Sequence, residues 1–238
     1  MNRAKLETIV VLAAALLAPA CYVTTDDSRS VTEHAAQTVD LRGAKSVNVQ
    51  VDMGAGELIM HGGAAPLLDA DFQYRSRDGK PEVRYDVAGT RGTLEVRQPE
   101  HHSIGNNEKN RWDLRLNDEV PLDIRVHMGA GEGRLTLGNT LLHSLDVEVG
   151  AGELNIDLTG HPRGEVDVRV RGGVGEATLH LPRRARLDVE AHGGIGEIST
   201  RGLTKRGDRW VNEPEGETDA TMHVSVNGGI GNINLICE

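Results

Sequence analysis

Aromatic residues are scarce in this chain of 238 residues, since Phe, Trp and Tyr together make up 3% of it. Val, Leu and Ile must therefore fill the core, and little aromatic surface is left to line a roomy sugar or lipid pocket. Several enzyme motifs are missing as well: the sequence has no Cys-x-x-Cys, no two histidines four residues apart and no Gly-x-Ser-x-Gly. These absences argue against the common zinc hydrolases and against α/β-type serine hydrolases.

Cysteines and long apolar runs are also few. The apolar run from Ile9 to Ala18 follows Arg3 and Lys5 and is too short to cross a membrane, which is typical of a signal-peptide core. It ends in Leu-Ala-Pro-Ala-Cys, which resembles a bacterial lipobox, where cleavage precedes a cysteine that is then diacylated. We expect residues 1–20 to be a signal peptide and Cys21 to carry lipid, while Ala-Pro-Ala also suits an ordinary signal peptidase.

The state that we expect for the second cysteine depends on whether Cys21 is lipidated. If Cys21 is lipidated, Cys237 is a lone thiol, and we expect it to be a small buried hydrophobe at the end of the last strand. If Cys21 is unmodified, a disulfide between the two cysteines is the alternative.

Positive charge is in deficit, because 26 Lys and Arg stand against 36 Asp and Glu, for a net charge of −10. An acidic surface disfavours nucleic acid and direct docking on anionic lipid, so the acyl chain would supply membrane attachment. Residues 21–45 are polar and predict a flexible tether. The sequence thus predicts a lipid-anchored, extracytoplasmic protein of the bacterial envelope, on the periplasmic face or the cell surface.

Glycine is abundant, with 29 residues, and much of it belongs to a phrase that occurs six times: an apolar alternation, Gly-x-Gly, usually Glu, and a second alternation. From the second copy to the fifth, the step is 21 to 23 residues. Self-similarity at this period indicates the coils of a solenoid, and the longer steps indicate coils with insertions.

Alternation with period two predicts strands, and the glycines predict narrow corners where backbones stack closely. No helical pattern follows them, so a phosphate-binding loop is disfavoured. The sequence therefore predicts an all-β solenoid of about six coils over residues 46–238. The predicted structural corner glycines are Gly54, Gly56, Gly129, Gly131, Gly150, Gly152, Gly173, Gly175, Gly194, Gly196, Gly229 and Gly231.

Two insertions interrupt the repeat. The first, at about 62–121, holds three alternating stretches separated by turn signals, which predicts an antiparallel meander. The second, at about 203–221, is predicted to be mostly loop and to carry any partner-specific surface. Trp112 and Trp210 are expected to cap the ends of the core. The final strand would leave an open edge, to be covered by the meander, a loop or a second copy.

Outward-facing charges support the stacking, because signs should alternate between coils through Arg125, Asp146 or Glu148, Arg169 and Glu190. Two acidic columns are candidates for calcium binding. The spacing of calcium-binding glycine repeats is absent, however, so we expect solvated carboxylates or acceptors of corner N–H groups, and neither a metal nor a cofactor. The columns are Glu57, Glu132, Glu153, Glu176 and Glu197, and Asp123, Asp167 and Asp188.

The GAGEL, WDLRLN and VPLDI stretches, the later GAGE and GGVGE corners, LHLP and the terminal GGIGNINL resemble the bacterial toast-rack family. That family is related to the putative adhesin family and to the C-terminal domain of cell-wall-active antibiotic response (Lia-type) proteins. The resemblance covers roughly Val47 onward and implies a right-handed β-solenoid of the cell envelope without an enzymatic activity to carry over. This chain lacks the several membrane helices that precede the domain in antibiotic response members.

We therefore expect a non-enzymatic, envelope-tethered scaffold with an interaction or adhesin-like role, for which a cell-envelope stress response is one setting. Its expected partners are an envelope protein or cell-wall glycan, the membrane through the lipid anchor, and a second copy through the solenoid end. The alternative is a β-helix that binds or cleaves polysaccharide with carboxylates on one solenoid face, since glycoside hydrolysis needs two carboxyl groups about 5 to 10 Å apart.

Overall fold

The computed structural model describes residues 31–99 and 110–238; the predicted signal peptide, Cys21 and the polar loop before Asn110 lie outside these ranges. The described chain is all-β, and its only helix is the single 3-10 turn η1 (Ser76–Asp78). Its strands are β1 (Thr32–Val39), β2 (Ser46–Ala64), β3 (Leu68–Arg75), β4 (Glu82–Ala88), β5 (Arg91–Arg97), β6 (Arg111–Asn117), β7 (Leu122–Thr136), β8 (Leu142–Asp157), β9 (Glu165–Leu181), β10 (Arg186–Ile195), β11 (Ile198–Arg201), β12 (Thr204–Arg206), β13 (Arg209–Val211) and β14 (Thr221–Cys237).

Each long strand turns a corner at its Gly-x-Gly. In β2, Val49, Val51 and Met53 are buried before the corner, whereas Leu58 and Met60 are buried after it. The buried positions change from odd to even because the chain bends there, so that both halves of the strand face one interior. Residues from both halves accordingly join a single hydrophobic core.

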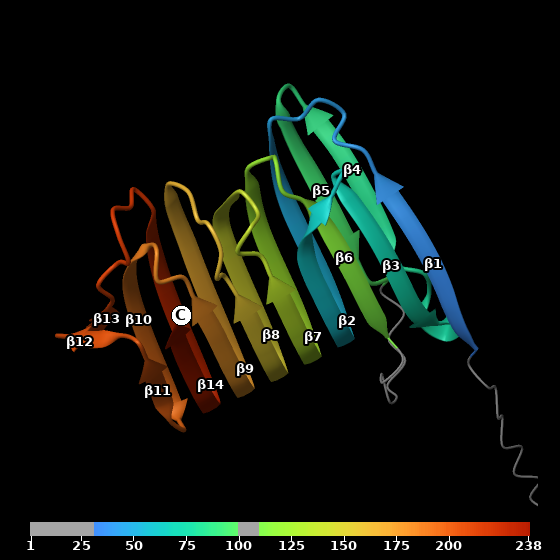
Figure 1. Ribbon diagram of the computed structural model, residues 1–238. Coiled ribbons are helices and arrows are strands. Elements are labelled where there is room, and N and C mark those ends of the chain that lie inside the picture. Colours follow the sequence, from blue (N-terminus) through green and yellow to red (C-terminus); the bar gives the residue numbers. More distant parts are fainter. Residues whose placement is uncertain (1–30, 100–109) are drawn as a thin grey trace, which may run out of the picture.

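The strand register arranges these halves into two sheets that share the long strands. The halves before the corners follow the order β4-β5-β2-β7-β8-β9-β14-β10-β13-β12. The halves after the corners follow β1-β3-β6-β2-β7-β8-β9-β14-β11. Long strands pair in parallel, corner beside corner, while β1, β3, β4, β12 and β13 add antiparallel pairings at the two ends (Figure 1). This is the β-solenoid that the repeat predicted.

The last strand of the chain does not lie at the end of the stack. β14 pairs with β9 on one side and with β10 and β11 on the other, so the prediction that it forms the open edge is wrong. β9 and β14 are complete coils of 17 residues, whereas the coil formed by β10 and β11 breaks after Ile195. A complete coil makes a longer ladder against another complete coil, and the interrupted coil is left outside.

The strand order also decides the charge pattern. Arg125 lies beside Asp146, and Asp146 lies beside Arg169, as predicted. The next neighbour of Arg169 is Ser225 of β14, so its predicted pairing with Glu190 is wrong. Glu190 instead lies on the far side of β14, opposite Ser225.

The first insertion is divided between the two sheets. Its three predicted strands exist as β3, β4 and β5, but only β4 and β5 pair with each other, so the predicted three-stranded meander is wrong. The turn at η1 and Gly79, whose φ is +76°, separates β3 from the β4-β5 hairpin. β5 extends the sheet before the corner of β2, and β6 extends the sheet after it, so that together they complete one further coil.

The segment expected to be a flexible tether contains β1. This strand pairs with β3 from Thr32 to Val39 and covers the backbone edge that β3 would otherwise expose. The tether prediction is therefore wrong for this part of residues 21–45. Only two of its four half-buried side chains, Ala35 and Val39, are apolar, which is why no strand pattern is visible in the sequence.

The second insertion is also more ordered than predicted, because β12 and β13 form a hairpin that pairs with β10 at Asp188 and Val189. Trp210 in this hairpin is half-buried against the core, with the Lys205 amine 5.0 Å from its ring centroid. Near the opposite end of the stack, Trp112 is fully buried. No helix in residues 31–99 or 110–238 is long and apolar enough to span a membrane.

Candidate functional site

The corners form a column in which successive backbones touch. A Cβ on Gly152 would lie 1.8 Å from the carbonyl oxygen of Gly131, and a Cβ on Gly175 would lie 1.7 Å from that of Gly152. Gly152 has a φ of +136°, which L side chains rarely adopt. Close stacking and backbone conformation thus both demand glycine at the second corner position.

The middle residue of each corner points outward and changes character along the stack. It is Ala55, Ala130 and Ala151 in β2, β7 and β8, but it is a larger aliphatic residue in the three coils that follow. Val174, Ile230 and Ile195 are 54%, 52% and 72% exposed. They are neighbours in the register of β9, β14 and β10, and we call these three residues the corner ridge.

The acidic column directly after the corners is in register as predicted. Glu57 lies beside Glu132, which is followed by Glu153 and Glu176. Asn232 then separates Glu176 from the last member, Glu197, because β14 lies between β9 and β10.

The carboxylate of this column with the most hydrogen bonds is Glu57, and its partners are arginine side chains and not backbone amides. Glu57 accepts a 2.6 Å hydrogen bond from Arg111 and a second one from Arg134, which also donates to Glu132 at 2.8 Å. Further along, the Asn234 amide donates to Glu176 at 2.7 Å. In the described residues, no group of three or more His, Cys, Asp or Glu side chains is arranged to hold a metal ion.

The second acidic column is not continuous. Ser144 lies between Asp123 and Asp167, and His223 lies between Asp167 and Asp188. In the register, none of these aspartates therefore lies directly beside another aspartate of the column. The aspartates of this column therefore form no continuous row of carboxylates of the kind that calcium would bind.

Asp123 shows the electrostatic effect of that arrangement. Partial burial alone would raise its pKa, but hydrogen bonds from Ser144 at 2.6 Å and His143 at 2.8 Å outweigh this and lower the pKa below its usual value. The same contact with Asp123 raises the pKa of His143.

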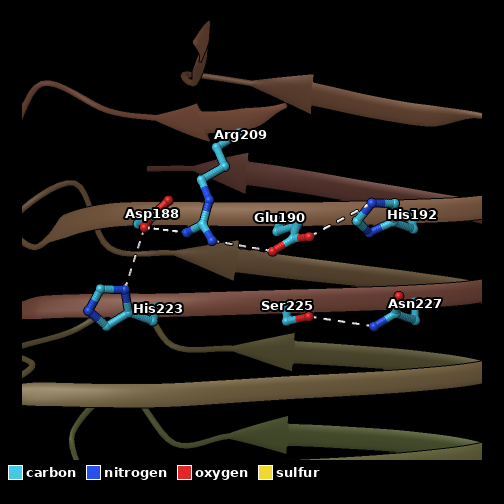
Figure 2. Close-up of polar contacts among 7 residues, drawn as sticks. All are labelled: Asp188, Glu190, His192, Arg209, His223, Ser225 and Asn227. Carbon is cyan, nitrogen blue, oxygen red and sulfur yellow. Dashed lines mark hydrogen bonds and ion pairs between the residues drawn. The ribbon is translucent and has the colours of Figure 1, made fainter. Parts of the chain in front are cut away.

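A second polar cluster lies on β10, β13 and β14 near the open end (Figure 2). Arg209 of the hairpin donates to Asp188 and lies 3.4 Å from Glu190. The His223 ring lies 3.6 Å from Asp188, whose pKa is lowered mainly by the hydrogen bond from Arg209. We call these four residues the Arg209 cluster; it fastens the hairpin to the edge of the stack.

Neither cluster is poised for proton transfer. The two described carboxyl groups with shifted pKa values, Asp123 and Asp188, are both held ionised, whereas a general acid needs a raised pKa. The thiol of Cys237 is buried, and burial raises its pKa, as befits an inert small hydrophobe. The described surface features that remain as candidates for binding are the two polar clusters, the corner ridge and the exposed edge at β10 and β11.

The corner ridge and the β12-β13 hairpin were not predicted from the sequence. The repeat alignment did contain the signal for the corner ridge, since the residue between the glycines changes from Ala to Val or Ile in the later copies. The hairpin has the turn sequence Gly207-Asp208 between Lys205-Arg206 and Arg209-Trp210, which is a hairpin signal too short to stand out.

The comparisons with known proteins agree with this architecture. Residues 27–180 match the family model described as the N-terminal domain of toast_rack, DUF2154. None of the curated proteins matches the chain.

Several solved structures also match the chain. A protein from Clostridium sporogenes, described as a putative cell adhesion protein, is 29% identical, covers 87% of this chain and 100% of its own, and superimposes with a TM-score of 0.83. A putative adhesin from Bacteroides fragilis is 10% identical over 86% of this chain and 97% of its own, with a TM-score of 0.33. Because the family model spans more than half of the chain, the chain belongs to the toast-rack family.

Proposed function

We propose that this protein is a non-enzymatic, adhesin-like interaction module that is held at the bacterial envelope by a lipid on Cys21. The open end of the stack, consisting of β10, β11 and the β12-β13 hairpin, engages an acidic envelope protein. The observation that carries this proposal is the incomplete cover of that end: within the described chain, β10 beyond Val189 and all of β11 have no neighbouring strand on the outer side.

The charge of the open end indicates the partner. Residues 183–212 carry seven Lys and Arg against four Asp and Glu, and residues 213–219, which connect β13 to β14, add four acidic residues. Arg206 and Lys205 lie exposed on β12, the outermost strand. The exposed positive charges of β12 favour encounter with a negatively charged surface, and an exposed strand edge offers backbone groups for β-strand addition.

Two further observations support binding without turnover. Asp123 and Asp188, the described carboxyl groups with shifted pKa values, accept hydrogen bonds and are held ionised. The Clostridium sporogenes protein, which is described as a putative cell adhesion protein, aligns over its whole length. An adhesin-like role therefore fits a rigid stack with an exposed strand edge at β10 and β11.

A crosslinking experiment tests this proposal. The lipidated protein is crosslinked in its own envelope and purified, beside a variant carrying Lys205→Glu and Arg206→Glu, which reverses the charge of β12 at two exposed positions. A matched control carries Lys45→Glu and Lys80→Glu, two exposed residues toward the opposite end of the stack. We expect a specific acidic protein partner that the β12 variant loses and the control keeps. Recovery of cell-wall glycan by all three forms, with no protein partner, would contradict the proposal.

A further inference from the structure

The large apolar side chains that the described protein exposes all lie on one long edge. They are the corner ridge and Val31, which is 64% exposed. Val31 immediately precedes β1, and β1 starts at the corner side of the stack. The first residue of β1, Thr32, lies opposite Arg75 at the end of β3. Two residues earlier in β3, Gln73 lies opposite Arg111 of β6, and Arg111 lies beside Glu57, the residue that follows the first corner. The N-terminal entry of the chain and the corners therefore share an edge, the lower one in Figure 1.

We propose that this corner edge lies against the surface of a lipid bilayer, with the corner ridge inserted at the interface as a second attachment point beside the N-terminal anchor. The proposal rests on the proposed function in one respect, namely that Cys21 carries the anchoring lipid. The ridge itself would bind the bilayer through aliphatic side chains on a rigid corner, and this binding does not depend on the lipid at Cys21.

The length of chain before Val31 fits this orientation. Ten residue steps separate Cys21 from Val31, and an extended chain covers at most about 35 Å over that length. Val31 and the ridge residue Ile195 are eight strand positions apart, or about 38 Å at roughly 4.8 Å per strand. A lipid on Cys21 thus tethers one end of the corner edge within reach of the bilayer, and the apolar ridge lies at the other end of the same edge.

The charges beside the corners are suited to a neutral lipid surface at the ridge. Around the first three corners the flanking positions carry Asp52, Glu57, Glu132, Glu148 and Glu153 with only His127 among them. In the three coils of the ridge, the same two positions hold one acidic residue at most. They are Arg171 and Glu176 in β9, Asn227 and Asn232 in β14, and His192 and Glu197 around the corner that follows β10. Acidic side chains thus become fewer where the aliphatic side chains begin, which lowers the cost of approaching lipid.

The size of the ridge favours lipid over a second protein. Three aliphatic side chains in a single row form a narrow protruding line, which falls far short of the roughly 800 Å² per partner that stable protein interfaces bury. Interfacial insertion of a few aliphatic side chains needs no such area, because its strength scales with the apolar surface that enters the lipid.

Vesicle flotation with the full mature chain, residues 21–238 carrying Cys21→Ser, tests the ridge without the acyl chain. The vesicles contain only zwitterionic phosphatidylcholine and phosphatidylethanolamine. The test variant is Val174→Ala, Ile195→Ala and Ile230→Ala, which installs the residue that the first three corners already have. We expect this variant to lose roughly tenfold to a hundredfold in vesicle partitioning.

A gain-of-binding variant completes the design. Ala55→Ile, Ala130→Ile and Ala151→Ile would extend the ridge along the edge, and we expect it to partition more strongly than the parent chain. Absence of vesicle binding by the parent, or equal binding by parent and triple-alanine variant, would overturn the proposal. A change in self-association without vesicles would assign the ridge to a second copy and would overturn it too. Palmitate labelling at Cys21 is measured separately, so a missing lipid anchor would not be mistaken for failure of the ridge.

Discussion

Replacing Gly152 by alanine would place a methyl group between two coils in the middle of the stack. The second glycine of this corner has a φ of +136°, and its new Cβ would lie 1.8 Å from the carbonyl oxygen of Gly131. Real Cβ atoms essentially never approach another heavy atom within 3.0 Å, so β7 and β8 must separate by more than 1 Å at the corner.

The expected loss follows from two contributions. The unfavourable backbone conformation costs about 1–3 kcal/mol for a residue with a side chain. Separation of the strands weakens about two ladder hydrogen bonds, worth about 1 kcal/mol each. We therefore expect Gly152→Ala to lower the free energy of unfolding by about 3–5 kcal/mol, a large part of the roughly 5–15 kcal/mol available to a domain.

Urea unfolding followed by circular dichroism measures this loss, and an unchanged m-value would show that the two forms expose the same surface. Gly172→Ala is the matched control, because this glycine has no positive φ and its Cβ would meet no heavy atom within 4 Å. The control should change stability by less than about 1 kcal/mol, and in the stabilising direction. Equal effects of the two substitutions, or a loss below about 1 kcal/mol for Gly152→Ala, would refute the stacking argument.

Three further predictions follow from other parts of the molecule. Trp112→Ala should cost about 3–5 kcal/mol in urea unfolding, because Trp112 is fully buried and packs edge-on against Phe72 with ring centroids 5.5 Å apart. His143→Gln should lower stability near pH 5.5 but not at pH 8: the pKa of His143 is raised, so its contribution is present below its ordinary value of 6.5 and is lost as the pH rises through the folded value. Equal destabilisation at both pH values would contradict the pairing with Asp123. In the Cys21→Ser chain, Cys237 should react with a thiol reagent only on unfolding, since it is buried, and fast labelling of the native protein would contradict this.

The solenoid could be predicted from the sequence because its signal is local and repeated. Each Gly-x-Gly phrase contains the alternation of both half-strands and the corner between them, and the register Gly56, Gly131, Gly152, Gly175 follows from aligning the phrases. The alternation of Arg125, Asp146 and Arg169 was predictable for the same reason, because these three coils are consecutive both in sequence and in space.

The strand order at the end of the stack depends on competition between distant segments. β10 follows β9 in sequence, yet β14 takes the place beside β9, since its complete length offers a longer ladder than the interrupted β10 and β11. The predicted pairing of Glu190 with Arg169 is wrong for this reason. The pairing of β1 with β3 is likewise a long-range contact, made by half-buried residues such as Ala35 that carry no pattern of their own.

The candidate site was predicted only in part. The acidic column and the glycine corners are local features of each repeat, whereas the corner ridge exists only because β14 places Ile230 between Val174 and Ile195. The Arg209 cluster likewise needs the hairpin to return to β10, which no single repeat encodes.

Depth measurement on lipid vesicles tests the envelope orientation most directly. An environment-sensitive dye is attached to a cysteine introduced by Ile230→Cys at the ridge, or by Asn139→Cys at an exposed turn on the opposite edge, in the Cys21→Ser chain. We expect the dye at the ridge to shift to the blue on zwitterionic vesicles and to be quenched by spin-labelled lipid, while the dye at residue 139 remains in water. Identical behaviour of the two sites, or no response at the ridge, would contradict the account.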